Sequence, residues 1–325
     1  MSRIESIIRT VMRMPRVAAL PGLGGAHTLR VYLAPQQLAS VMLHGGRELH
    51  GSAHSAELDN PGGHWQGAIE ALRALILQSR VAAADITLEI SLASRWCQMV
   101  LAPWSDALLS PADAARFLQT QLAALYGDQA RSWQIVADDT PYGSPRTVCG
   151  ADTLLIEALK ALAADQGCRC QIIEPALATA LRTLPRQPKT RAAFVPGAAD
   201  AAGASGAPLQ APARAAARGL AAHALAVVES GRITMATIQS GHITAIQSQP
   251  CGLTWQLELP QAWQRWTLRA PELAAIESIA VIDLCPPRST ALALAPPPLP
   301  PRFHLQANPF GAPQAPTKTA AGEAA

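Results

Sequence analysis

Hydrophobic and polar residues alternate over residues 29–50 in a pattern typical of short strands joined by tight turns. Apolar runs at 29–33 and 38–43 flank the turn Ala-Pro-Gln-Gln at 34–37, and Gly45-Gly46 forms a second turn before 47–50. Such runs, separated by two to four turn-forming residues, predict antiparallel hairpins. We therefore expect a three-strand meander at the start of the folded region.

Helices and strands are then expected to alternate as far as residue 184. The helical segments place apolar residues three and four positions apart, as at Ile69, Leu72 and Ile76. The pattern predicts helices at 64–79, 111–126, 151–165 and 175–184. It predicts strands at 86–91, 96–101, 132–137, 147–149 and 169–173.

Residues 224–246 resemble the opening meander. Apolar runs at 224–229, 233–239 and 242–247 are separated by turns at 229–232 and 240–241. A short helix at 261–266 and a buried strand at 279–284 follow. A β-β-β-α-β unit that occurs twice predicts an α/β protein with two ribonuclease-H-like lobes, the plan of the actin superfamily. Two unrelated α/β lobes are the alternative.

Two stretches have a different composition from these lobes. Residues 186–222 are dominated by Ala, Gly, Pro and Ser, which is typical of a linker or an insertion. Residues 286–325 contain ten prolines, and we expect a disordered or polyproline II tail that does not pack. The expected organisation is an N-terminal helix and linker at 1–28, a first lobe at 29–185, a linker at 186–222, a second lobe at 223–285 and a tail at 286–325.

The N-terminal segment has an amphipathic helical pattern that ends near Pro15. Its apolar face is formed by Ile4, Ile7, Ile8 and Val11, and its basic residues off that face are Arg3, Arg9 and Arg13. One interpretation is a helix that packs on its own lobe. The other is a helix that docks on an anionic membrane surface or on a partner.

Composition and charge limit the function classes. Hydrophobic residues make up 49% of the chain and charged residues 15%, which excludes a wholly disordered protein. The net charge of +3 does not indicate a nucleic-acid partner. No apolar run approaches the roughly 20 residues of a membrane span. The six cysteines form no C-x-x-C pair, so we expect reduced cysteines in a cytoplasmic protein and no metal site.

One stretch resembles a known family. Residues 91–104 comprise a strand, a turn with Ser94 and Arg95, a second strand and Pro103-Trp104. This order resembles the middle of PilM-like proteins, the actin-like proteins of type IV pilus assembly, and of the cytoplasmic domain of the type II secretion L protein. The resemblance implies a two-lobed actin-like fold, a cytoplasmic location at the inner membrane, and a pilus or secretion assembly protein as partner.

Nucleotide chemistry is the next question that the resemblance raises. Actin-fold ATPases carry a D-x-G-x-[S/T] turn between the first two strands of each lobe, which binds phosphate and organises Mg²⁺. The turn at 34–37 has no acid and no glycine, whereas the second turn keeps Glu229, Ser230 and Gly231 in a different order. We therefore predict a degenerate member with no catalytic residues and no cofactor. ATP with Mg²⁺ at Glu229, Ser230 and Gly231 is the alternative.

These observations lead to one main functional hypothesis and two alternatives. The main hypothesis is a non-catalytic, actin-like scaffold of a pilus or secretion assembly. An active actin-fold ATPase or small-molecule kinase is the second hypothesis. A soluble α/β protein unrelated to pili is the third.

Overall fold

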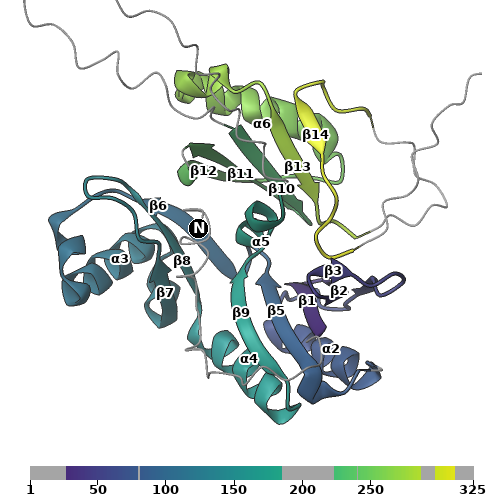
Figure 1. Cartoon of the computed structure of the whole chain (residues 1–325). Coiled ribbons are helices and arrows are strands. Elements are labelled where there is room, and N and C mark those ends of the chain that lie inside the picture. Colours follow the sequence, from purple (N-terminus) through teal and green to yellow (C-terminus); the bar gives the residue numbers. More distant parts are fainter. Residues whose placement is uncertain (1–26, 80, 185–222, 240, 287–296, 312–325) are drawn as a thin grey trace, which may run out of the picture.

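The computed structural model describes residues 27–79, 81–184, 223–239, 241–286 and 297–311. These residues form two lobes, one above the other in Figure 1, and a smaller subdomain beside them. The N-terminal helix with Ile4, Ile7, Ile8 and Val11, and the linker at 186–222, lie outside the described residues. None of the described helices combines the length and apolar character that a membrane crossing requires.

The first lobe is built on a sheet with the strand order β3-β2-β1-β5-β9. Its meander is antiparallel, whereas β5 is parallel to β1 and β9 is parallel to β5. The short strand β4 also pairs with β2 and completes the outer edge. The strands are β1 (His27–Ala34), β2 (Gln37–His44), β3 (Arg47–Glu48), β4 (His54–Glu57), β5 (Ile86–Leu92) and β9 (Arg169–Pro175).

Two helices, α2 (Trp65–Gln78) and α4 (Thr153–Asp165), cover one face of this sheet and bury its apolar side chains. The buried residues of α2 include Ile69, Leu72 and Ile76, as their spacing predicted. Asp152 caps α4, because its carboxylate accepts a hydrogen bond from the Leu154 amide at 2.9 Å.

The second lobe has the strand order β12-β11-β10-β13-β14. Again the first three strands are antiparallel, and β13 and β14 run parallel to β10. Helix α6 (Trp255–Arg269) buries three tryptophans against this sheet. The strands are β10 (His223–Glu229), β11 (Arg232–Gln239), β12 (His242–Pro250), β13 (Ile279–Asp283) and β14 (Phe303–Leu305).

The two lobe sheets therefore share one strand order and one set of directions. In each sheet, two further strands, parallel to the first strand of the meander, extend the sheet on the side of that first strand. This confirms the duplicated ribonuclease-H-like unit and the two-lobed actin-like fold predicted from the sequence.

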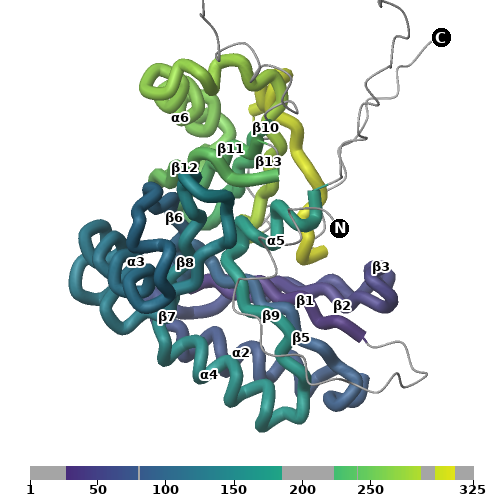
Figure 2. Tube along the Cα trace, turned by 60° about the vertical axis from the view of Figure 1, so that its left-hand side comes forward, coloured from purple at the N-terminus to yellow at the C-terminus, as the bar shows by residue number. Residues whose placement is uncertain are grey.

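A subdomain inserted between β5 and β9 was not separated from the first lobe by the sequence. Its sheet has the order β6-β8-β7 and is covered by α3 (Pro111–Tyr126), with a small core of its own (Figure 2). Gly150 is required there, since a Cβ would lie 2.7 Å from the Trp133 ring. The strands are β6 (Cys97–Ala102), β7 (Trp133–Ala137) and β8 (Arg146–Asp152). Short 3-10 helices span Ala83–Asp85, Asp106–Leu109, Asp128–Ser132 and Pro271–Ala275.

Three sequence predictions need correction. The third strand at 47–50 is only two residues long, because a turn with Gly51 at φ 73° interrupts the edge before β4. The helix at 261–266 extends over Trp255–Arg269, because its buried face continues on both sides of Pro260. The expectation that residues 286–325 do not pack is wrong for 297–311, where β14 pairs with β13 and Phe310 is fully buried.

Candidate functional site

Helix α5 (Ala176–Thr183) lies between the two lobes (Figure 1), where its apolar residues pack in one cluster with residues of both lobes. In the first lobe Ala34 pairs with Gln37, so Pro35 and Gln36 form a tight two-residue turn. This turn offers no carboxylate, and Pro35 has no amide hydrogen to donate. It therefore contributes little that could bind phosphate or Mg²⁺.

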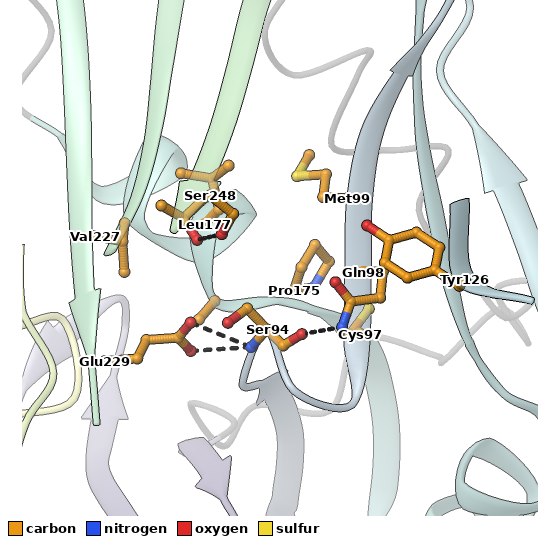
Figure 3. A pocket seen from close by; sticks show the side chains of 12 residues that line it. Ser94, Cys97, Gln98, Met99, Tyr126, Pro175, Leu177, Val227, Glu229 and Ser248 are labelled. Carbon is orange, nitrogen blue, oxygen red and sulfur yellow. Dashed lines mark hydrogen bonds between the residues drawn. The ribbon is translucent and has the colours of Figure 1, made fainter. Parts of the chain in front are cut away.

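The second turn directs its acid inward, toward the first lobe. Glu229 pairs with Arg232, Gly231 adopts φ 79°, and the Glu229 side chain is buried. Its Oε1 accepts hydrogen bonds from the Tyr32 hydroxyl and from the Ser94 amide, both at 3.0 Å. The Ser94 amide also lies 3.2 Å from Oε2 (Figure 3). We call these three residues the interlobe latch.

Burial controls the ionisation of the interlobe latch. It raises the pKa of Glu229 above its ordinary value, although the hydrogen bonds from Ser94 and Tyr32 act in the opposite direction. Burial, together with the charge of Glu229, holds the pKa of Tyr32 well above its ordinary value. The phenol is therefore a neutral hydrogen-bond donor, and the latch connects the lobes without offering a free acid to a ligand.

Ser230 and Gly231 are exposed on the turn, whereas Glu229 is buried. The structure therefore does not bring these three candidate nucleotide contacts to one surface. Tyr32 and Ser94 were missed at the sequence level. The only signal was indirect, because Ser94 lies in the stretch that resembles PilM-like proteins and Tyr32 is an aromatic residue with a polar group inside an apolar strand.

A small cavity lies beside the interlobe latch, with a volume of about 30 Å³. It is lined in part by Ser94, Gln98, Met99, Val227, Thr234 and Ser248 (Figure 3). That volume holds roughly one or two water molecules, whereas small-molecule sites usually measure about 300–1,000 Å³. Apolar side chains of both lobes form one buried cluster at the joint.

A buried charge network anchors α5 to the first sheet. Arg182 donates to Glu174 at 2.7 Å and to Glu89 at 3.1 Å, and Arg30 donates to Glu89 at 2.9 Å. Burial acts to raise the pKa of Glu89, but Arg182 and Arg30 outweigh it and hold that pKa below its ordinary value. The Thr179 hydroxyl also donates to Glu174, at 2.5 Å. The network has a structural role, because it fixes the position of α5 between the lobes.

Two thiols lie together, and one of them, that of Cys97, belongs to a residue that lines the small cavity. The Sγ atoms of Cys97 and Cys149 are 3.0 Å apart, and both residues are buried. Their hydrogen bond and their burial raise the pKa of Cys97 well above its ordinary value, so that it stays a thiol and is a poor nucleophile. Within the described ranges, no three His, Cys, Asp or Glu side chains are arranged to hold a metal ion.

No protein-family model and no curated protein matches the sequence. Solved structures match the fold. The cytoplasmic domain of EpsL, an inner membrane component of the type II secretion system of Vibrio cholerae, has 13% identity and a TM-score of 0.45, with 87% of this chain and 91% of that domain covered. The PilM–PilN type IV pilus biogenesis complex has 10% identity and a TM-score of 0.49, with 79% and 81% covered.

A third match is a Bacteroides thetaiotaomicron protein with an actin-like ATPase fold and unknown function. It has 10% identity and a TM-score of 0.43, with 82% of this chain and 85% of that chain covered. At such identities the likeness concerns the fold.

Proposed function

We propose that the protein is a non-catalytic, actin-like scaffold of a type IV pilus or type II secretion-like assembly, at the cytoplasmic face of the inner membrane. The observation that supports a non-catalytic role is the orientation of the Glu229 side chain, which points toward the first lobe. This is the acid of the second phosphate turn, and Tyr32 and Ser94 of the first lobe engage it. The first turn has no acid at all.

The assembly part of the proposal rests on the sequence resemblance at residues 91–104. The same stretch supplies Ser94 to the interlobe latch, and its second strand β6 carries Met99 and Leu101 against the apolar cluster shared by the lobes. The resembling segment thus supports the joint between the lobes. The partner that we propose is an inner-membrane pilus or secretion assembly protein.

Calorimetry with ATP and Mg²⁺ tests the non-catalytic part. We expect no binding heat at micromolar nucleotide and no phosphate release above a protein-free blank. The physical reason is the small volume of the interlobe cavity and the inward orientation of Glu229. Micromolar affinity, or turnover that Glu229→Gln abolishes, would contradict the proposal and support an actin-fold ATPase.

Deletion of residues 1–16 tests the location. If this segment tethers the protein, membrane co-sedimentation is lost while the melting temperature changes little. The apolar face of Ile4, Ile7, Ile8 and Val11 would contribute about 1.5–3 kcal/mol per buried side chain. Arg3, Arg9 and Arg13 would add about 1 kcal/mol each near an anionic surface.

A matched variant with the three arginines changed to glutamine separates lipid from protein as the tether. Loss of binding to anionic vesicles, with binding to native inner membranes retained, indicates a protein partner. A large fall in the melting temperature of the deletion variant, with unchanged sedimentation, would show that the helix packs on its own lobe and would contradict the tether.

A further inference from the structure

The described C-terminal residues leave the second lobe and end against the first. Strand β14 adds to the second sheet beside β13. The chain is then fixed by Asn308, whose amide donates to the Asp283 carbonyl at 3.1 Å and whose side-chain oxygen accepts from the Phe310 amide at 2.9 Å. In Figure 1 this yellow segment descends from β14 to the neighbourhood of β2 and β3. We call residues 303–311 the C-terminal strap.

The end of the C-terminal strap is inserted into the joint between the lobes. Phe310 is fully buried, and its ring centroid lies 5.3 Å from that of Tyr32. Gly311, at φ 70°, passes so close to the first lobe that a Cβ would lie 3.0 Å from Val41, Ala53 and Glu48. Only glycine fits this conformation and this space without strain.

Tyr32 connects the C-terminal strap with the interlobe latch. The Tyr32 ring contacts the Phe310 ring, and the Tyr32 hydroxyl donates a hydrogen bond to Glu229 at 3.0 Å. Because interiors are close-packed, the Phe310 ring limits the positions that the Tyr32 ring can take. The strap therefore holds the hydroxyl where it meets the carboxylate of the other lobe.

We propose that the C-terminal strap is a lock that keeps the two lobes closed, and that its release opens the joint between the lobes while each lobe stays folded. The root of the strap is a strand of the second lobe, and its tip occupies the first lobe. A ligand or partner that displaced Phe310 would therefore uncouple the lobes. This inference holds whether or not the proposed scaffold role is correct.

The Ser94 amide is a natural reporter of the lock, because it donates to Glu229 across the joint. Hydrogen exchange of the full chain, followed by mass spectrometry, compares Phe310→Ala with the wild type. We expect exchange at Ser94 to accelerate on the order of a hundredfold. Exchange within α2, whose buried residues pack in the core of the first lobe and not in the apolar cluster shared by the lobes, stays unchanged.

Phe303→Ala is the matched control. Phe303 is equally part of the C-terminal strap and is buried, but it packs in the core of the second lobe alone. Its removal accelerates exchange in β13 and leaves Ser94 at the wild-type rate. An equal acceleration at Ser94 in both variants, or none in Phe310→Ala, would overturn the lock.

A second variant covers the case in which Phe310→Ala unfolds. Gly311→Ala leaves the Phe310 ring intact. It displaces the end of the C-terminal strap because there is no space for a Cβ at this position. We again expect faster exchange confined to the joint. Acceleration spread evenly over both lobes would show that the strap supports global stability only, which contradicts the proposal.

Discussion

Replacing Arg182 with methionine is expected to lower the free energy of unfolding by about 3–5 kcal/mol at pH 7. Methionine keeps much of the apolar volume and removes the charge. Glu174, whose side chain is only 1% exposed, then loses its ion-pair partner. A buried carboxylate without a compensating charge is costly, and among the residues that the structure describes only the Thr179 hydroxyl would still donate to it.

Urea unfolding at several pH values measures this effect and its pH dependence. The pKa of Glu89 is held below its unfolded value, so its contribution is present above about pH 4.3 and is lost as the pH falls through the lowered pKa. Arg182 is one of the two cations that lower the pKa of Glu89. The difference in the free energy of unfolding between wild type and variant should therefore become smaller toward low pH.

The surface pair Arg131–Asp128 provides the matched control for Arg182. Its two side chains are 73% and 91% exposed, and Arg131→Met should change stability by less than about 0.5 kcal/mol. Similar losses for the two arginine variants would show that burial of the network does not determine its contribution. A double variant, Arg182→Met with Glu174→Gln, should recover part of the loss because it leaves no unpaired charge at Glu174.

Tyr32→Ala should destabilise the protein by about 3–5 kcal/mol, the usual range for loss of a buried aromatic ring. The ring is 1% exposed and contacts Phe310, so its removal leaves a cavity at the joint between the lobes. Tyr32→Phe keeps the ring and removes one hydrogen bond to a carboxylate, at a cost of about 1.5–3 kcal/mol. Chemical denaturation of both variants separates the contribution of packing from that of the hydrogen bond.

Glu229→Gln is the companion variant, because its neutral amide oxygen still accepts from Tyr32 and Ser94. The folded-state pKa of Glu229 is raised by burial, so the folded protein binds this proton more tightly than the unfolded chain does. Its contribution to stability is therefore largest below about pH 4.3 and falls as the pH rises through the raised pKa. Glu229→Gln should remove this loss of stability with rising pH. An unchanged pH profile in Glu229→Gln would show that Glu229 does not titrate at the joint.

The repeated meander was predictable because both copies use local signals, namely apolar runs and two-residue turns. The Pro35-Gln36 and Ser230-Gly231 turns fix the register of each hairpin. The sheet order followed from the repeat. The inserted subdomain was not recognised as separate, because its strands have the same local pattern as those of the lobe.

The interlobe latch and the C-terminal strap were not predictable from local patterns. Tyr32 and Glu229 are 197 positions apart, and no periodicity connects them. Strand β14 is three residues long and follows a proline-rich run, so composition indicated a tail that does not pack. Its order depends on tertiary contacts, above all on the burial of Phe310 in the apolar cluster shared by the lobes.

The order of the elements along the chain, with β14 and Phe310 far behind the strands of the first sheet, has a consequence for biosynthesis. The sheet of the first lobe is complete once Pro175 has been made, and it can pack on α2 and α4 at that point. The second sheet gains β14, and the joint gains Phe310, only after residues 303–311 have been made, roughly ten seconds later at ordinary rates of translation. During that interval the apolar surface around Tyr32 and Leu177 lacks the cover that Phe310 later provides.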